Sequence, residues 1–386
     1  MDTTLKNRLT TLIYDEYKKL KPSSRPVVKS NGTKEWTVLA SIVAWNTTTD
    51  NLRLITLSTG VKALPDILLL KSNGRMVHDC HAEILSMRGF NTVILNHIKN
   101  IEQGKPSDLL EKDNSKYTWR PENKIMLYIS RMPCGDASMD TMEDRSDSSS
   151  EFEITDDNQS QYLLEGNTTL LRGRLNFSKK GYVRSKPGRY DSQITLSKSC
   201  SDKICMKQIT SLLNAVTYDL LTTPVYLDYI LIPSLESTDL IGLERCFKDR
   251  LSKNDQELAI PPHVFFTVET CDNEFIDDKK YEDEAPSAMS AIRLYYDMSN
   301  VQEQAILNGV KNGSFVKGSK PLPKGCEIVV SRLGQWKLYK EINPNVTESY
   351  LEFKGKQTNR RNMIDRLRQK LSPDGWIHTR KDDCQV

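Results

Sequence analysis

Residues 78–99 read HDCHAEILSMRGFNTVILNHIK, and the apolar positions in this stretch repeat at the spacing of a helix. These positions are Ile84, Leu85, Phe90, Val93, Ile94 and Ile98. The pattern predicts a helix over His81–Lys99, with the polar motif HAE at 81–83 in its first turn. Unpaired backbone N–H groups and a partial positive charge make a helix N-terminus a suitable place for polar chemistry.

The segments around this helix alternate between strand-like and helical patterns. Strand-like runs cover 36–45, 52–57, 124–130, 226–232 and 264–268. Helical spacing covers 5–20, 204–221, 238–251 and 346–371. This alternation predicts an α/β fold with helices on both faces of one sheet. The last helical segment is strongly basic on its polar side, so we expect an extended basic helical region at the C-terminal end.

Length and composition exclude several classes of protein. The 386 residues, 38% of them hydrophobic and 27% charged, are typical of a soluble globular chain of one or two domains. The eight cysteines are too sparse for a disulfide-stapled scaffold, so we expect an intracellular protein, cytoplasmic or nuclear. The N-terminal stretch is too charged for a secretory signal, and no apolar run reaches the ~18 residues of a membrane helix.

The net charge of +3 combines two opposite contributions. Residues 140–161 hold eight Asp or Glu and one Arg, so they carry −7 and the rest of the chain +10. This segment has few residues that could fill a core, and we expect a disordered acidic insertion within a domain. Ten Lys or Arg stand against two Asp at 172–207, and fifteen against six acidic residues at 317–381. Such basic faces suit RNA, although solvated, scattered lysines would give the same counts.

Three short motifs can form one metal site: HAE at 81–83, PCG at 133–135 and SCSDK at 199–203. Each stands at a predicted junction with a helix, where a cysteine thiolate is favoured. One His and two Cys are a complete set for a catalytic zinc, which keeps its fourth position for water. Glu83 can then stand beside that water and carry its proton to a leaving amine, because zinc lowers the pKa of the water towards ~7.

Each motif also has a plainer explanation. A lone His at a helix start is commonly a cap or core residue, and single buried cysteines commonly behave as small hydrophobes. The PCxxC spacing of the deaminase signature is absent, because PCGDA at 133–137 has no second cysteine. A structural zinc module would need a fourth ligand, for which Cys205 is the nearby candidate, although on a helix it would face away from Cys200.

In combination, HAE, PCGDA and SCSDK resemble the adenosine deaminases acting on RNA, in which the second cysteine lies on a separate helix. SNGTKEWTVLASIVA at 30–44, TGVK at 59–62 and RSKPGR at 184–189 match the same family. The RSKPGR motif and the chain length make the sequence similar to the tRNA-specific branch. The resemblance is specific over 31–232 and faint beyond Pro233.

The resemblance implies a cytidine-deaminase-like mixed sheet and zinc-dependent deamination of adenosine to inosine. The implied target is adenosine 37, on the 3′ side of the anticodon, in the anticodon stem-loop of alanine tRNA. Deamination of another RNA or of free nucleosides is the alternative activity. A catalytically silent RNA-binding subunit is the alternative from another class, and such a protein would be expected to lack Glu83.

The family roles transfer onto matching positions of this sequence. His81, Cys134 and Cys200 match the zinc ligands, Glu83 the proton carrier, and Thr59 and Lys62 the target-nucleotide pocket. The family also buries inositol hexakisphosphate. The positions that match its surroundings are Arg88, Lys186, Lys203, Tyr350, Lys354 and Trp376. Asp79 matches a hydrogen-bond relay between the metal and the phosphates.

This sequence departs from the family pattern at three positions around the implied phosphate site. Met87 and Met206 replace expected arginines, and Lys207 replaces an expected tryptophan. We expect the inositol phosphate to be retained, with cations such as Lys207, Arg332, Arg360 and Arg361 in compensation, because so highly charged a ligand needs many cationic partners when buried.

The spread of these residues along the chain bears on domain count. Zinc ligands at 81, 134 and 200 and phosphate contacts from 88 to 376 can meet only if nearly the whole chain wraps one core. We therefore expect one deaminase domain over 1–386, monomeric and without a membrane segment.

Overall fold

Eight strands form one mixed sheet in the computed structural model, which describes residues 1–140, 163–165, 168–173, 179–186, 193–252, 265–318, 320–373 and 375–386. Their order across the sheet is β13 (Thr267–Cys271), β12 (Tyr229–Pro233), β8 (Asn123–Ile129), β2 (Leu39–Asn46), β3 (Asn51–Thr59), β15 (Met289–Tyr295), β16 (Val301–Leu307) and β17 (Val310–Lys311). Strands β8, β12 and β13 are parallel, and the other neighbours are antiparallel. The expected mixed sheet is confirmed.

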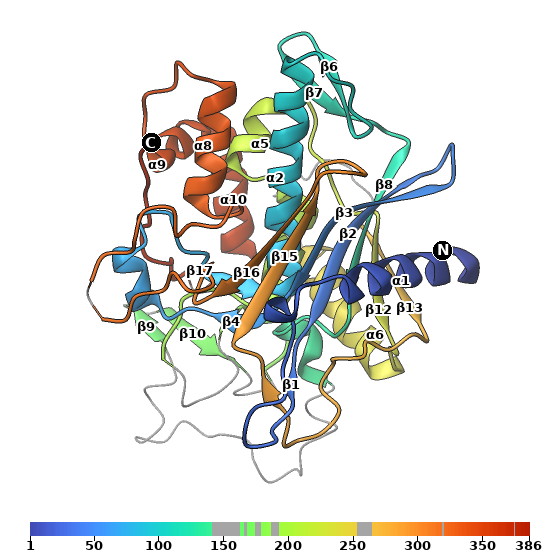
Figure 1. Cartoon of the computed structure of the whole chain (residues 1–386). Helices are drawn as coiled ribbons and strands as arrows, with labels where there is room; N and C mark the ends of the chain where they lie inside the picture. The colour runs from blue at the N-terminus through green and yellow to red at the C-terminus, as the bar shows by residue number, and fades with distance from the viewer. Residues whose placement is uncertain are drawn as a thin grey trace.

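Helices cover both faces of this sheet, as expected (Figure 1). On one face, α1 (Thr3–Lys18) packs through Leu9, Ile13 and Tyr17. The other face is covered by α2 (Ala82–Glu102), α4 (Cys200–Thr210), α5 (Ala215–Leu220), α8 (Arg332–Ile342), α9 (Tyr350–Lys356) and α10 (Thr358–Leu371).

Strand β2 shows why the sheet separates two hydrophobic cores. Leu39 and Val43 belong to the core under α1, whereas Ile42 and Ala44 belong to the core under α2. Successive side chains of a strand point to opposite faces, so one apolar strand serves both layers.

Several small elements surround the sheet. Short strand pairs are β1 (Glu35–Trp36) with β14 (Ala285–Pro286), β4 (Val61–Ala63) with β5 (Asp79–His81), and β6 (Leu110–Asp113) with β7 (Lys116–Trp119). A separate sheet joins β9 (Leu163–Glu165), β10 (Thr168–Arg172) and β11 (Arg184–Ser185). Helical turns are η1 (Pro22–Ser24), η2 (Asp66–Lys71), η3 (Asp136–Ser138) and the run α6 (Ser237–Glu244), η5 (Arg245–Asp249) and α7 (Arg250–Ser252). In the part of the chain that the structure describes, no helix is long and apolar enough to cross a membrane.

Two helices expected as continuous are each divided in two. The segment 204–221 is interrupted after Thr210, because Ser211 takes a φ of +62° and Asn214 begins α5 with a capping box to Thr217. The segment 346–371 begins only at Tyr350, where Ser349 and Glu352 form another capping box, and it breaks at Gln357. Local capping therefore overrides the longer apolar periodicity.

Other differences lie in the second half of the chain. The strand expected at 264–268 lies at Thr267–Cys271, a shift of three residues. Strands β15 to β17 and helix α8 were not expected at all. The expected acidic insertion at 140–161 lies outside the described residues, apart from Asp140.

Candidate active site

Strand β5 delivers His81 to the N-terminus of α2. His81 is the last residue of β5 and the N-cap of the helix, so its side chain lies at the positive end of the helix dipole. Gly60 of the TGVK motif makes this placement sterically feasible. Its φ is +152°, a Cβ there would lie 2.1 Å from the Cys80 carbonyl oxygen, and its own carbonyl accepts a hydrogen bond from Ala82 at 3.0 Å.

The two cysteines come from loops that touch each other. Cys134 follows β8, and Cys200 is the first residue of α4, whose N-cap is Ser199. Gly135, with a φ of +109°, lets the loops approach, because a Cβ there would lie 2.2 Å from Ser199 Oγ. Two hydrogen bonds then join the loops: Ser201 N donates to the Cys134 carbonyl at 3.0 Å, and Cys200 N donates to Cys134 Sγ at 3.4 Å.

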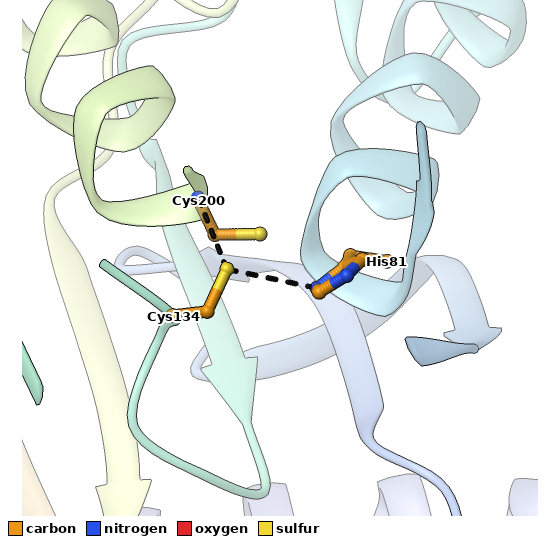
Figure 2. Close-up of side chains that lie close together, drawn as sticks. All are labelled: His81, Cys134 and Cys200. Atoms are coloured by element: carbon orange, nitrogen blue, oxygen red, sulfur yellow. Dashed lines mark hydrogen bonds between the residues drawn. The ribbon is translucent and has the colours of Figure 1, made fainter. Parts of the chain in front are cut away.

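Figure 2 shows His81, Cys134 and Cys200 converging from these three segments. Their ligand atoms all lie within 4.8 Å of one another, and His81 Nδ1 lies 3.9 Å from Cys134 Sγ. Zinc–ligand bonds of about 2.0–2.3 Å in a tetrahedron place neighbouring ligand atoms roughly 3.5–3.8 Å apart. One imidazole and two thiolates therefore fit a zinc ion after a small contraction. Among the described residues this group holds only these three ligands, and Cys205 is not part of it.

Lys186 and Asp79 support the thiolates from behind. Lys186 Nζ donates to Cys200 Sγ at 3.0 Å and to both carboxylate oxygens of Asp79 at 2.8 Å. Burial lowers the pKa of Lys186, but the nearby charge of Asp79 and the thiols raises it further, so the net pKa lies above its usual range. Lys186 therefore stays charged. The hydrogen bond from Cys200, together with the Lys186 charge, lowers the pKa of Cys134 well below its usual range despite burial.

Asp79 balances two lysines and also touches His81. Its carboxylate accepts hydrogen bonds from Lys186, Lys203 and the backbone N–H of His81. Burial raises the pKa of Asp79, but the charges of Lys186 and Lys203 outweigh it and hold the pKa well below its usual range. The structure thus places Asp79 beside His81, and the relay role that the resemblance implies for it stays a prediction.

Glu83 is the chemically unsatisfied group of this site. It lies in the first turn of α2, is only 2% exposed, and in the described structure its Oε2 is buried without a hydrogen-bond partner. Its charge acts on both Cys200 and Lys186, which places it close to the thiolates. A buried carboxylate oxygen normally has a partner. A water on the open position of a zinc ion would supply one.

The residues expected to contact the substrate lie on and next to the short strand pair that ends at His81. Lys62 pairs with Cys80 in the β4–β5 ladder, and its neighbour Val61 pairs with His81. Thr59 ends β3 and is buried, 1% exposed, next to Gly60. The structure thus brings the TGVK motif to the metal ligands, while the contact of its side chains with a nucleotide stays a prediction.

Apart from these metal-ligand candidates, eight cations, all buried or half-buried, form what we call the buried cation cluster. Its members are Arg88, Lys198, Lys203, Lys207, Arg332, Lys354, Arg360 and Arg368. Only three carboxylates among the described residues form ion pairs with it: Asp382 with Arg332, Asp79 with Lys203, and Asp365 with Arg368.

The cations of the cluster are buried close to one another, and this lowers the pKa of several of its lysines. Burial and the charges of Arg360, Lys354 and Arg88 lower the pKa of Lys207 to about 7. Burial lowers the pKa of Lys198 to about 8. Cations are not brought together in a low-dielectric region without compensation, so the cluster fits a bound polyanion such as an inositol phosphate.

Aromatic rings complete the cluster. Lys198 and Arg368 stand over the ring of Trp376, with the charged groups 5.1 and 5.4 Å from its centroid. Arg332 stands 5.2 Å from the centroid of Tyr350. Tyr350, Lys354 and Trp376 therefore lie in or against the cluster, and their contact with an inositol phosphate stays a prediction. Lys198 and Arg368 were missed, because an isolated lysine or arginine in a basic segment carries no signal of burial.

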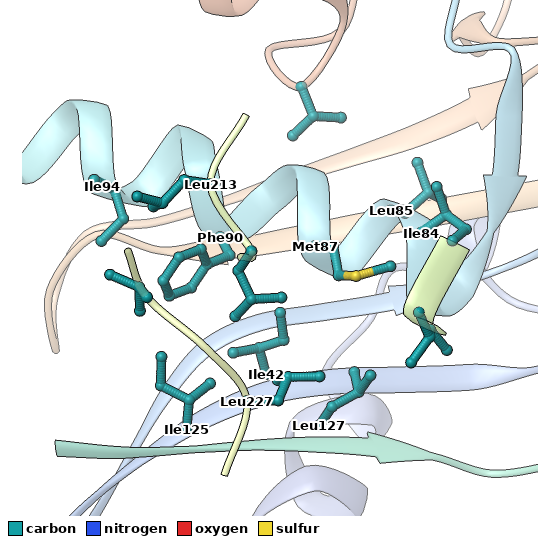
Figure 3. Close-up of a cluster of buried hydrophobic side chains, with 14 of the residues drawn as sticks. Ile42, Ile84, Leu85, Met87, Phe90, Ile94, Ile125, Leu127, Leu213 and Leu227 are labelled. Carbon is teal, nitrogen blue, oxygen red and sulfur yellow. The ribbon is translucent and has the colours of Figure 1, made fainter. Parts of the chain in front are cut away.

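The three departures from the family pattern have a structural explanation. Met87 points into the core with Phe90 and Leu127 (Figure 3), and Met206 packs against the same core. Lys207 Nζ donates to the carbonyls of Leu212 and Leu213 at 3.2 Å and remains within the charge field of the cluster. Arg361 is exposed, so of the four expected compensating cations it is the one outside the cluster.

Comparison with known proteins adds independent evidence. The model of the adenosine-deaminase (editase) domain matches residues 56–366. A tRNA-specific adenosine deaminase 1 of Saccharomyces cerevisiae is 44% identical over 99% of this chain and 94% of its own length. The protein of the same name from Schizosaccharomyces pombe is 31% identical over 90% of this chain and 89% of its own. A double-stranded RNA-specific editase B2 of Mus musculus is 27% identical over 49% of this chain and 26% of its own.

Proposed function

The chain belongs to the adenosine-deaminase (editase) family and is an adenosine deaminase, and we propose that it acts on tRNA by zinc-dependent hydrolysis. Its fold is consistent with the cytidine-deaminase-like class that the sequence implied. One observation carries the zinc proposal: His81, Cys134 and Cys200 converge beside the buried, unpartnered Glu83.

In this proposal the three converging side chains hold the zinc. Burial raises the pKa of the Cys200 thiol, and the hydrogen bond and charge of Lys186 oppose that rise, so they favour the thiolate that the metal needs. When bound, the metal makes water a nucleophile near neutral pH, since it lowers the pKa of that water from 15.7 to about 7. The partial positive charge at the N-termini of α2 and α4 also favours negative charge at this site. The chain itself orients the reacting groups and keeps bulk water out of the site.

Glu83 carries the protons of the reaction. It accepts a proton from water as the oxygen bonds to C6 of adenine, and it delivers this proton to N1. The proton of the new hydroxyl group then passes by way of Glu83 to the exocyclic nitrogen. The C6–N6 bond breaks, ammonia leaves, and inosine remains, so one water is consumed for each ammonia released.

The proposal that tRNA is the substrate is supported by two fungal relatives whose names include tRNA and by the basic segments of the sequence. We propose adenosine 37 of alanine tRNA, the target implied by the resemblance to the tRNA-specific branch. A loop adenosine is incompletely paired, so extruding it towards the metal ligands near Lys62 costs less than in a duplex. The basic surfaces would contact phosphates of the anticodon stem-loop.

We also propose that the buried cation cluster holds inositol hexakisphosphate. The support is the imbalance between eight cations and three paired carboxylates, together with the match of Arg88, Lys203 and Lys354 to family positions. Phosphorus analysis of purified, denatured protein is expected to give close to six phosphorus atoms per chain. Absence of stoichiometric phosphorus would contradict the proposal.

The function is tested by incubating the purified protein with total tRNA and mapping inosine, with free adenosine and cytidine as parallel substrates. We expect inosine at position 37 of alanine tRNA and no change in either nucleoside. Inosine at other positions would contradict the proposed target, and deamination of free nucleosides would favour the alternative activity. A protein inactive on every substrate would favour a silent RNA-binding subunit.

We further propose that the protein is a monomer located inside the cell. The wide spacing of its cysteines supports a reducing compartment. Sedimentation at micromolar concentration is expected to give a single species near the chain mass of 44.1 kDa.

A further inference from the structure

The helix that runs through α6, η5 and α7 contains a π turn at Arg245–Asp249. Here the backbone N–H of Arg250 bonds to the carbonyl of Arg245, five residues earlier. In a regular α-helix, residues five apart lie about 140° apart around the axis. The wider π turn brings the two positions closer to one side of the helix, and both guanidinium groups lie within 4 Å of the same carboxylate. Turns of this kind are rare and frequently mark functional sites.

That carboxylate is Asp136, two residues after the metal ligand Cys134. Its Oδ2 lies 3.5 Å from Arg245 Nε and 3.8 Å from Arg250 Nη1, and Arg245 also donates to the Asp136 carbonyl at 2.7 Å. Close packing supports these contacts. Gly242 of α6 lies so close to η3 that a Cβ there would be 2.3 Å from the Ala137 carbonyl oxygen. The helix therefore packs directly against the loop that carries Cys134.

Arg250 also reaches the second cysteine loop. Its Nη2 donates to Asp202 Oδ1 at 2.7 Å, and Asp202 lies two residues after Cys200. Asp202 Oδ2 in turn accepts hydrogen bonds from Ser199 Oγ at 2.5 Å and from Arg184 N at 2.9 Å. One guanidinium group thus connects the two loops that supply the thiolates.

The same carboxylates hold the segment that carries Lys186. Gly181 N donates to Asp136 Oδ1 at 2.5 Å, and Arg184 N donates to Asp202. These anchors precede Lys186, which donates to Cys200 Sγ. Asp136 and Asp202 are both fully buried, and the Arg250 side chain is 5% exposed. Removing the cation would take from buried Asp202 its ion-pair partner at 2.7 Å and would leave Asp136 with Arg245.

We propose that Arg250 is a positioning residue for the metal centre, fixing through Asp136 and Asp202 the spacing between the Cys134 loop and the Cys200 helix. This inference rests on the zinc site of the proposed function. Arg250 touches neither metal nor substrate. It acts on the ligands through groups behind them, and such outer partners commonly alter metal affinity 10- to 100-fold.

The test compares Arg250→Gln, Arg250→Lys and the control Arg53→Gln, all in the full chain. Arg53 is also a largely buried arginine paired with an aspartate, Asp108, but it lies in β3 away from the cysteine loops. For each variant, zinc affinity is measured by chelator competition, and the visible spectrum is recorded after cobalt replaces zinc. Unfolding temperature and the kcat and KM for tRNA are measured on the same preparations.

We expect Arg250→Gln to weaken zinc binding 10- to 100-fold and to shift the cobalt absorption bands, with a loss in kcat rather than in KM. Arg250→Lys keeps the charge but cannot bridge both carboxylates, so an intermediate loss is expected. Arg53→Gln is expected to lower only the unfolding temperature.

Wild-type zinc affinity and cobalt spectrum in both Arg250 variants would overturn the inference, as would an equal loss of affinity in Arg53→Gln. If Arg250→Gln does not fold, the comparison of Arg250→Lys with wild type decides. A wild-type chain that binds zinc but leaves tRNA unchanged would contradict the proposed function alone, because the affinity comparison would still stand.

Discussion

Burial changes what individual charged residues do in this molecule. Lys186 and Asp79 are both buried and form an ion pair with two hydrogen bonds. The lysine donates a third hydrogen bond to Cys200 Sγ. Glu83 is equally buried but keeps one oxygen without a partner in the described structure. The first pair is saturated and holds ligands in place, whereas Glu83 retains the capacity to bind and transfer a proton.

His97 provides a prediction at the same scale. Burial, aided by the charge of Arg53, lowers the pKa of His97 to about 4 from its usual 6.5. Between these values the unfolded chain binds a proton that the folded chain does not, so stability falls as the pH drops from 6.5 to 4, by up to about 3 kcal/mol.

Urea unfolding of wild type and His97→Gln between pH 4 and 7 tests this effect. The free energy of unfolding of the variant is expected to fall less steeply with decreasing pH over that window. The difference in slope corresponds to at most one proton bound on unfolding. Parallel curves for the two proteins would contradict the expectation.

At the scale of elements, tight contacts at glycines bring the metal loops together. Gly135 has a positive φ, and its missing Cβ makes room for Ser199 of the second cysteine loop. We expect Gly135→Ala to weaken zinc binding at least tenfold, since disturbing the groups that hold metal ligands in place commonly lowers metal affinity 10- to 100-fold. Gly104→Ala is the matched control, because Gly104 also has a positive φ, +77°, but a Cβ there meets nothing within 4 Å.

Chelator competition on both glycine variants separates steric contact from backbone strain. Both substitutions place alanine at a positive φ, so both are expected to lower the unfolding temperature. Only Gly135→Ala is expected to change zinc affinity. Equal zinc affinity in the two variants would show that the loop contact is unimportant.

Elements also show what the sequence could and could not predict. Segments with a strong apolar pattern, such as α1, α2, β2 and β8, were predicted close to their observed bounds. The helices repeat apolar residues at helical spacing, and the strands are apolar on both faces. The breaks at Ser211 and Gln357 were not, since they depend on capping and on tertiary contacts such as that of Gln357 Nε2 with the Ala215 carbonyl at 2.7 Å. Strands β15 and β16 went unnoticed because polar and apolar residues are mixed along them, although both lie between other strands of the sheet.

The candidate site was predicted more completely than the fold around it. His81, Cys134, Cys200 and Glu83 lie in short motifs with a recognisable donor set, so their chemistry is visible locally. Arg245 and Arg250 carry no such signal, because they reach Asp136 from a helix more than 100 residues away in the sequence. Long-range partners of this kind emerge only when the chain is folded.

At the scale of the whole molecule, the buried cation cluster joins the C-terminal helices to the metal side. Its members range from Arg88 in α2 to Arg368 in α10, and Lys203 links it to Asp79. A polyanion in its centre would therefore stabilise contacts between the first and last parts of the chain. Without that ligand, mutual repulsion would oppose folding.

Lys354→Met tests this role, with Lys356→Met as control on the same helix. Lys354 lies within the cluster, whereas Lys356 is exposed and pairs with Glu348. We expect Lys354→Met to reduce bound phosphorus and to lower the unfolding temperature by several degrees, consistent with a loss of about 1–3 kcal/mol. Lys356→Met is expected to match wild type in both measurements. Unchanged phosphorus content in Lys354→Met would argue against the cluster as the polyanion site.

The most direct measurement of the central claim is inosine formation in tRNA by wild type and Glu83→Gln, with zinc content determined on the same samples. Glutamine keeps the size of the side chain but cannot accept and return the proton. We predict one zinc per chain in both proteins, inosine in tRNA with wild type, and a loss of at least 100-fold, about 3 kcal/mol, in the variant. Substantial activity in zinc-loaded Glu83→Gln, or none in zinc-loaded wild type, would contradict the account.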